Sequence, residues 1–396
     1  MKKIIILMPS MFIGGAERSL LGLLETIDYS RYDVSLFLYR HEGEFLKYIP
    51  EKVHILSEMP QYRTFDTPIR SLLFSRQTLF GLERLRAKAA AWLHTKTTGE
   101  RCGVWMSMQY IAKFLQRRLP NIPGEYDLGI MYLGIADTLI NKVQAKKKIT
   151  WNHTDYDTLF PNRAMDLETY NTVDAVVSVS ADCTEKLKAF YPTLADKAIT
   201  IENTLAEQFI KACAEEPQTD MLAGDSKVLL SVGRFCDAKN FDNVPDICRR
   251  LTESGLNVKW YLIGYGGNEV LIRRKIVELG MQDRVIILGK KDNPYPYMRA
   301  CDLYVQPSRY EGKAVSVREA QLLCKPVIIT KYDTSDSQLE DGTDGIVVPM
   351  DNEGCASGIA ALLRDPERMR QLSENCKKRD YTNSAEVEKI YALTED

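Results

Sequence analysis

Two glutamates, Glu311 and Glu319, stand with seven residues between them, shortly after an apolar segment that ends at Pro307. A helix is predicted to begin near Ala314, which would place Glu311 in the loop before it and Glu319 more than one turn inside it. A carboxylate inside such a helix can accept hydrogen bonds from vicinal hydroxyls, and one in the loop lies beside whatever the helix N-terminus binds. The alternative is structural: Glu319 faces solvent, and Glu311 only complements the helix dipole.

Groups suited to an anion surround this acidic pair. The free amides of Lys313, Ala314 and Val315 at the predicted helix N-terminus can hold a phosphate. Arg234 and Lys239, five residues apart, follow another strand-like segment and can pair with a diphosphate. The alternative for these two residues is a pair of ordinary surface cations.

Glycines mark two turns between a predicted strand and a predicted helix. Gly264, Gly266 and Gly267 precede a helix expected from about Asn268, and Gly14-Gly15 precedes a helix expected over residues 16–27. Such turns let the backbone approach a nucleotide phosphate, but glycines there often serve tight packing alone. Each motif is weak evidence by itself.

The elements that must position these residues form two series of apolar strands alternating with amphipathic helices. The first series of expected strands is Lys3–Met8, Val34–Leu38, Leu128–Tyr132, Lys148–Trp151 and Ala175–Val179. The second is Val228–Val232, Lys259–Ile263, Val285–Leu288, Leu303–Gln306, Pro326–Thr330 and Ile346–Val348. This alternation predicts an α/β protein with two doubly wound, Rossmann-like domains of parallel strands, facing each other across an interdomain cleft.

The expected domain boundaries follow from where this periodicity is lost. We predict an N-terminal domain over residues 1–205, a linker over 206–226, a C-terminal domain over 227–375, and a tail over 376–396 that packs back on the N-terminal domain. Ligands of open α/β sheets bind beyond the carboxyl ends of the strands. The candidate residues fall at such strand ends.

One segment, residues 63–118, interrupts the alternation. It holds eleven Lys or Arg and three acids, a net charge of +8, interleaved with Phe80, Trp92 and Trp105. One interpretation is a basic amphipathic helix or helix pair on an anionic membrane surface. The other is a solvated helix pair whose apolar face covers the N-terminal sheet, and the two are compatible.

Composition narrows the class of protein. The chain has 52 Lys or Arg and 54 Asp or Glu, a near-balance that argues against a chain-wide nucleic-acid surface. No apolar run approaches the roughly 18 residues of a membrane span. Pro9 and early charges argue against an export signal, and nine scattered cysteines lack metal or redox spacing. We therefore expect a cytoplasmic protein, with peripheral attachment to the inner face of the membrane as the consequence of the basic segment.

The C-terminal half resembles a retaining glycosyltransferase of family 4, which has the GT-B architecture. The resemblance runs in order through SVGRFCDAKNF, YLIGYGGNEVLIRRKIVELGMQDRVIILG, NPYPYMRACDLYVQPSRYEGKAVSVREA and KPVIITKYDTSDSQLEDGTDGIVVP, and covers nearly all of residues 228–370. In the N-terminal half it is weaker and rests on MPSMFIGGAERSLL, residues 151–153 and residues 199–203.

The resemblance implies roles for individual residues. Arg234 and Lys239 match the basic pair that contacts the donor diphosphate and stabilises the leaving group. Glu311 matches the glutamate beside the transferred sugar, and Glu319 the one on the ribose hydroxyls. His153 matches a catalytic histidine that approaches the donor sugar, although the residues alone favour a packed or capping histidine. The other implied donor-binding residues are Gly15, Gly264, Lys290, Gly312, Lys313, Ala314 and Val315.

Four positions depart from the family pattern. Lys313 and Ala314 stand where an aromatic and a small residue are usual, and Glu202 and Thr204 replace a proline and a glycine that flank Asn203. Lys313 adds a cation near the sugar, which would suit an acidic donor or acceptor or point outward. These changes bear on substrate contacts more than on catalysis.

The resemblance implies transfer of a hexose or N-acetylhexosamine from a nucleotide-sugar, with UDP as the expected nucleotide, to a glycan acceptor, for which a lipid-linked glycan is one candidate. The segments that carry the resemblance contain no Asp-x-Asp motif of metal-dependent transferases, so we expect no metal site and no cofactor. Two alternatives remain open: a non-catalytic subunit that binds a glycan or a protein, and a nucleotide-sugar epimerase on the same fold.

Overall fold

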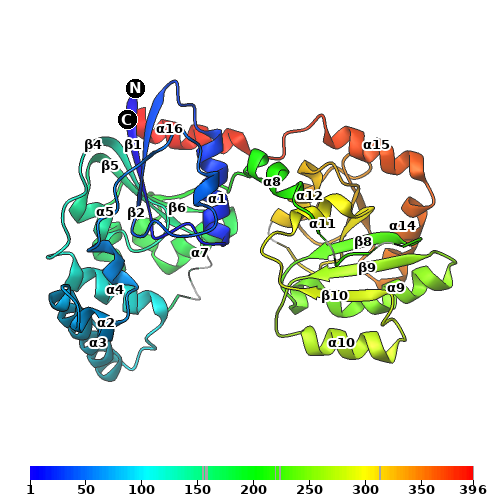
Figure 1. Ribbon diagram of the computed structural model, residues 1–396, viewed down its shortest axis with the longest axis horizontal. Coiled ribbons are helices and arrows are strands. Elements are labelled where there is room, and N and C mark those ends of the chain that lie inside the picture. The colour runs from blue at the N-terminus through cyan, green and yellow to red at the C-terminus, as the bar shows by residue number, and fades with distance from the viewer. Residues whose placement is uncertain (154–155, 157–158, 219, 223, 312–313, 396) are drawn as a thin grey trace. The chain divides into compact units, whose positions relative to one another are not determined.

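The computed structural model describes residues 1–396 except 154–155, 157–158, 219, 223, 312–313 and 396. The chain forms two compact units, one of residues 1–206 with 383–396 and one of residues 207–382 (Figure 1). The sequence analysis placed the boundary within 206–226, and the chain passes from the first unit to the second between Ala206 and Glu207. We describe each unit separately as unit 1 and unit 2.

Unit 1 is built on a seven-stranded parallel sheet with strand order β3-β2-β1-β4-β5-β6-β7. Its strands are β1 Lys2–Met8, β2 Tyr32–Leu38, β3 His54–Ile55, β4 Glu125–Met131, β5 Gln144–Asn152, β6 Ala175–Ser178 and β7 Ala198–Thr200. Its helices include α1 Gly15–Thr26, α2 Ile69–Leu73, α3 Thr78–Thr98, α4 Val104–Leu115, α5 Asp137–Lys142, α6 Arg163–Tyr170, α7 Ala181–Phe190 and α16 Val387–Glu395. The sequence missed only the two short edge strands, β3 and β7, as strands.

Unit 2 is built on a six-stranded parallel sheet with strand order β10-β9-β8-β11-β12-β13. Its strands are β8 Lys227–Val232, β9 Val258–Ile263, β10 Val285–Gly289, β11 Leu303–Gln306, β12 Val327–Thr330 and β13 Ile346–Val348. Its helices include α8 Glu207–Ala214, α9 Val244–Glu253, α10 Glu269–Glu278, α11 Tyr295–Ala300, α12 Val315–Leu322, α13 Ser335–Gln338, α14 Asn352–Leu363 and α15 Pro366–Cys376. All six strands were predicted from their apolar runs.

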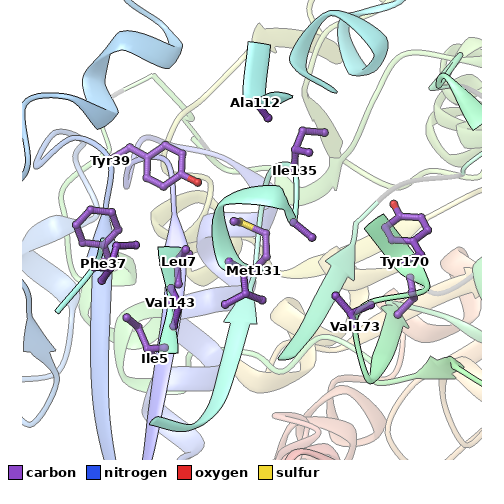
Figure 2. Close-up of a cluster of buried hydrophobic side chains, with 14 of the residues drawn as sticks. Ile5, Leu7, Phe37, Tyr39, Ala112, Met131, Ile135, Val143, Tyr170 and Val173 are labelled. Carbon is purple, nitrogen blue, oxygen red and sulfur yellow. The ribbon is translucent and has the colours of Figure 1, made fainter. Parts of the chain in front are cut away.

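Each unit has its own hydrophobic core on its central strands. In unit 1, Ile5 and Leu7 of β1 pack with Phe37 of β2 and Met131 of β4 (Figure 2). Strands buried on both faces read as continuous apolar runs, which is why these segments were recognisable from sequence. Because all strands are parallel, the loops at their carboxyl ends gather along one edge of each sheet.

The C-terminal helix α16 belongs to unit 1 and lies beside β1 (Figure 1). Tyr391 stacks on Tyr32 with ring centroids 4.2 Å apart, and its hydroxyl accepts a hydrogen bond of 2.7 Å from the Asp28 N–H. Residues 383–396 therefore return to the unit that holds the N-terminus, while 376–382 remain in unit 2.

The basic segment forms helices α2, α3 and α4, and its aromatic residues divide between two environments. Phe80 and Trp105 pack against the core of unit 1, and the Trp105 indole donates to the buried Asp166 carboxylate. Trp92 and Phe74 are 62% and 85% exposed. The segment thus has an inner side that covers the core and an outer apolar surface.

In the part of the chain that the structure describes, none of the helices combines the length and apolar character that crossing a membrane requires. All nine cysteines are free thiols, and five of them are buried.

Candidate functional site

The loops after β8 and β11 bring two of the predicted residues together. Lys239, in the loop after β8, places its Nζ 2.6 Å from Oε1 of Glu311, in the loop after β11. The strands are neighbours in the sheet, so residues 72 positions apart in sequence meet at its carboxyl edge. Lys239 is 19% and Glu311 9% exposed at the side chain. The pair is therefore largely shielded from water and stronger than a surface ion pair.

Glu311 is held by three donors that reach the same carboxylate oxygen. Besides Lys239, Ser308 Oγ donates to Oε1 at 2.6 Å and Gln306 Nε2 at 3.2 Å. Tyr304 donates in turn to Gln306 Oε1 at 3.0 Å and so fixes that amide. The second oxygen, Oε2, takes no hydrogen bond from the described residues. The site thus has a buried carboxylate that is oriented through one oxygen, while the other has no hydrogen-bond partner among the described residues.

Arg234, the other cation of the predicted pair, is in a different situation. Its side chain is exposed and makes no ion pair or hydrogen bond with any residue that the structure describes. It follows β8 and lies five residues before Lys239, so an anion could meet it without displacing an existing partner.

A second ion pair, which the sequence analysis did not identify, fixes the loop after β11. Arg309 reaches both oxygens of Asp242 at 3.0 and 3.1 Å, and its N–H donates to the Ala238 carbonyl at 2.8 Å. Burial works against ionisation of Asp242, but the cations of Arg309 and Lys275 hold its pKa below the usual value. Arg309 is therefore a positioning residue for the segment that carries Lys239.

Glu319 lies inside α12 and is 5% exposed, so it is not the solvent-facing residue of the structural alternative. The Tyr295 hydroxyl, from α11, donates to Glu319 Oε1 at 2.8 Å. Both side chains are buried, and Phe209 packs edge-on against the Tyr295 ring. A hydroxyl that orients a buried carboxylate suits the predicted role on vicinal hydroxyls.

Gly264 holds the loops after β8 and β9 in backbone contact. It has φ of +149°, and a Cβ there would lie 1.8 Å from the carbonyl oxygen of Gly233. Gly266 has φ of +155°, and a Cβ there would lie 2.4 Å from the carbonyl oxygen of Phe235. Hydrogen bonds cross between the loops from Phe235 N to Tyr265 O at 2.9 Å. Gly264 thus serves close packing of the two loops, the alternative that the sequence analysis considered. Through this packing it positions the loop that carries Arg234.

The N-terminus of α12 differs from its predicted form. Gly312 and Lys313 lie outside the described residues. The Ala314 N–H, predicted as a free amide for phosphate, donates to Gln338 Oε1 at 2.7 Å. Gln338 Nε2 also donates to the Ala314 carbonyl at 3.3 Å. Val315 begins the helix and is 45% exposed, so an anion at this helix would meet Val315 before Ala314.

Lys290 follows β10 and is exposed, with its Nζ 3.4 Å from Asp292. The preceding residue, Gly289, accepts a 2.9 Å hydrogen bond from the Gly264 N–H. Lys290 therefore starts the loop on the same sheet edge as the loops after β8 and β9.

The loop after β12 contributes residues that the sequence analysis missed. Thr334 Oγ1 donates to the Glu311 carbonyl at 2.7 Å. The hydroxyls of Tyr332 and Ser335 are buried without a hydrogen-bond partner among the described residues. Their signal in the sequence was position alone: they follow a predicted strand end at Thr330, where ligand-binding loops of α/β sheets occur.

In unit 1, His153 follows β5. Its Nε2 lies 2.8 Å from the Tyr132 carbonyl, so the neutral ring with a proton on Nε2 donates there, and Nδ1 is left as an acceptor. Burial lowers the pKa of His153 to about 4, against the hydrogen bond to Tyr132, which favours the charged form. The histidine is therefore neutral at neutral pH, and its packed position agrees with the interpretation that the residues alone favoured.

Gly15 begins α1 at the same sheet edge of unit 1, is exposed, and has open space around its Cα. One turn later, Ser19 Oγ lies 2.6 Å from the Tyr132 hydroxyl and donates to Asn203 Oδ1 at 2.6 Å. Ser19 and Tyr132 thus connect the glycine turn, His153 and Asn203, and neither was singled out from sequence.

Within the described ranges, no three His, Cys, Asp or Glu side chains gather as metal ligands would. The predicted residues of unit 2 that the structure brings together are Lys239 and Glu311, with Arg234, Gly264 and Lys290 on the same edge of the sheet.

The Lys239–Glu311 pair predicts a specific stability pattern. Lys239→Ala should lower the free energy of unfolding by about 3 kcal/mol, because it leaves a buried carboxylate without its cation. Lys239→Met combined with Glu311→Gln should recover most of that loss. Lys275→Ala is the matched control, since Asp242 keeps Arg309, and should cost under about 1 kcal/mol. Urea unfolding measures all three; equal losses for Lys239→Ala and Lys275→Ala would contradict the assignment.

The buried His153 predicts a pH dependence of stability. Its folded pKa of about 4 lies below the ordinary value of 6.5, so the unfolded chain binds this proton first. Stability from this residue is complete above about pH 6.5 and falls as the pH drops towards 4. Relative to His153→Gln, the wild type should lose about 2 kcal/mol between pH 7.5 and pH 5 in urea unfolding. Exposed His41→Gln is the control, and parallel curves for wild type and His153→Gln would refute the prediction.

Comparison with protein-family models gives a match for residues 214–379 to the glycosyl transferases group 1 family. This segment contains the β8, β9, β10, β11 and β12 loops described above.

Curated relatives match over the same part of the chain. This chain is 30% identical over 154 residues to the alpha-D-kanosaminyltransferase of Streptomyces kanamyceticus, and the match covers 38% of this chain and 40% of the relative. It is 28% identical over 159 residues to the Campylobacter jejuni N-acetylgalactosamine-N,N'-diacetylbacillosaminyl-diphospho-undecaprenol 4-alpha-N-acetylgalactosaminyltransferase, covering 40% and 42%. The matches thus span about two fifths of the length of these relatives.

Solved structures match over the whole chain. Anabaena HepE, solved with UDP and glucose, superposes with a TM-score of 0.60 at 17% identity, covering 99% of this chain and 100% of HepE. Staphylococcus aureus TarM superposes with a TM-score of 0.63 at 14% identity, covering 100% and 99%. At these identities the likeness establishes the fold. The chain therefore has the GT-B fold, and its residues 214–379 match the glycosyl transferases group 1 family.

Proposed function

We propose that this protein is a retaining glycosyltransferase that moves a hexose or N-acetylhexosamine from a UDP-sugar to a glycan acceptor. The observation that carries the proposal is the buried Glu311 carboxylate, which is oriented through Oε1 by the cation Lys239 and by Ser308, on the sheet edge to which the loop of Arg234 also belongs. The family match of residues 214–379 and the fold shared with a UDP-bound neighbour support it.

The donor lies along the carboxyl edge of the unit 2 sheet in this proposal. Arg234 and Lys239 pair with the diphosphate, and Glu319, held by Tyr295, accepts the ribose hydroxyls. Glu311 Oε2 contacts the transferred sugar. Val315 approaches the sugar and phosphates, and Lys290 holds the base through its main chain.

Departure of UDP leaves oxocarbenium character at the anomeric carbon. The two cations stabilise the charge that develops on the diphosphate, and Glu311 lies close enough to stabilise the positive sugar. The β-phosphate then takes the proton of the incoming hydroxyl on the same face, so the configuration is retained without a protein nucleophile.

The charge of the leaving group is neutralised by Arg234 and Lys239, so the reaction proposed here uses no divalent ion and no cofactor. The acceptor is proposed to be a lipid-linked glycan. A relative named for a diphospho-undecaprenol-linked substrate supports this choice.

Unit 1 is proposed to dock on an anionic membrane at the cytoplasmic face through residues 63–118. Phe74, just after α2, and Leu79 and Trp92 of α3 are exposed at 85%, 56% and 62%. Two exposed cations, Arg76 between the two helices and Lys88 on α3, make no ion pair with the described residues. Near an anionic leaflet each such cation contributes about 1 kcal/mol.

Arg234→Ala tests the donor site without disturbing the fold. Because Arg234 is exposed, stability should change by less than about 0.5 kcal/mol. UDP affinity in calorimetric titration should fall about tenfold to a hundredfold, as expected for loss of a charge-assisted contact of about 1.5–3 kcal/mol. Arg274→Ala, also exposed, is the control. Transfer should fall together with UDP binding. Unchanged UDP affinity in Arg234→Ala would show that this residue is not part of the donor site.

Chelation tests how the diphosphate charge is stabilised. Transfer, or slow donor hydrolysis if the acceptor is unknown, should persist in excess chelator. Complete loss that manganese or magnesium restores would show that a divalent ion carries this charge. Donor binding without any turnover would instead favour a non-catalytic subunit.

Sedimentation with vesicles tests the docking surface. The protein should bind anionic vesicles at low salt and be released at high salt, because exposed charges are screened. Arg76→Glu, Lys88→Glu and Lys96→Glu together should abolish binding. Arg84, in contrast, donates to the carbonyls of Thr64 and Phe65 and is left unchanged.

The matched control reverses three exposed cations of unit 2, Arg274, Lys377 and Lys378, and should bind as the wild type does. If the wild type stays in solution at low salt, or if both triple variants lose binding equally, the docking surface is wrong and a soluble acceptor becomes the better candidate.

A further inference from the structure

An apolar groove of about 420 Å³ runs between α3 and α4. Ala87 and Ala91 of α3 form part of its wall, with Trp92 beside them, Ile111 of α4 opposite and Ile69 of α2 at one end. Its volume is that of a small-molecule pocket, about 300–1,000 Å³. It lies wholly within unit 1 and shares no residue with the candidate donor site.

The groove follows from small residues in a particular helical register. Ala87 and Ala91 are four residues apart and therefore lie on one face of α3. They are 1% and 6% exposed, so that face is turned towards α4. A methyl group is too short to fill the space between the two helices, and a trough with almost wholly apolar walls remains.

Positive charge stands at the rim of the groove. Lys88 lines it, is exposed, and makes no ion pair with the described residues, and no Asp or Glu is among the described residues that line it. Arg84 also lines it but is held by backbone carbonyls. Lys96 lies 6.0 Å from the centre of the Trp92 ring. The groove thus suits a ligand with a hydrocarbon body and an anionic head.

We propose that this groove takes one acyl chain of an anionic phospholipid from the membrane on which unit 1 docks. The inference rests on the docking part of the proposed function and extends it from a charged surface to a defined lipid site. Trp92 lies at the groove with 62% of its surface exposed, the position that amphipathic rings take at a membrane–water interface. A second copy of the chain is the occupant that the test must exclude.

Fluorescence of Trp92 reads out the occupant directly. Subtracting the fluorescence of Trp92→Phe from that of the wild type removes the contribution of the other three tryptophans and leaves the emission of Trp92. Vesicles containing phosphatidylglycerol with brominated acyl chains should quench this Trp92 emission. The groove-filling variants Ala91→Leu and, at the other end of the same face, Thr95→Leu should lose this quenching. Their vesicle affinity should fall about tenfold, because the chain no longer enters.

Ala89→Leu is the matched control, because it makes the same substitution at an exposed position of the same helix that does not line the groove. It should be quenched as the wild type is. Quenching that persists in both groove-filled variants, or wild-type binding without quenching, would overturn the lipid site. A concentration-dependent dimer that both variants abolish, without lipid quenching, would overturn it in favour of a second copy.

Monomeric dihexanoyl phosphatidylglycerol separates this inference from the proposed function. If vesicles fail to bind but the monomeric lipid shifts Trp92 emission in the wild type and not in Ala91→Leu, the groove is a lipid site and the docking proposal fails. If neither lipid form affects Trp92, the lipid site is wrong. UDP titration reports on the donor site independently of both results.

Discussion

The contact between Lys239 and Glu311 is the constraint on which the arrangement of unit 2 depends. One ion pair of 2.6 Å joins the loops after two neighbouring strands and holds the Glu311 carboxylate through Oε1. A buried carboxylate is costly unless cations and hydrogen-bond donors surround it, and Ser308 and Gln306 complete that set. The geometry that stabilises the loops therefore also orients the carboxylate, while Oε2 has no hydrogen-bond partner among the described residues.

The rest of the sheet edge makes this contact possible. Gly264 and Gly266 allow the loops after β8 and β9 to lie backbone against backbone. This contact fixes the backbone of the loop from which the side chains of Arg234 and Lys239 extend. Arg309, in the loop after β11, holds the segment after β8 through its ion pair with Asp242. The glycines thus determine the path of the backbone, and the ion pairs determine the orientation of the side chains.

The sequence predicted the central strands and the fold class because apolar runs buried on both faces are unambiguous. It placed Lys239 and Glu311 in loops that follow two predicted strands, but it could not show that these strands are neighbours or that the two side chains bind each other. A helix N-terminus predicted as free is capped by Gln338, a residue 24 positions away in sequence. Ser19, Tyr132, Tyr332 and Ser335 were missed for the same reason, since their environment depends on contacts between distant segments.

The central claim is that unit 2 binds a nucleotide-sugar beside Glu311, and saturation-transfer NMR with a panel of nucleotide-sugars tests it most directly. The account predicts transfer to the ribose and hexose protons of a UDP-sugar, with the hexose signals weakened in Glu311→Gln and the ribose signals weakened in Glu319→Gln. If no nucleotide-sugar receives saturation from the wild type, or if both variants leave every signal unchanged, the account is contradicted.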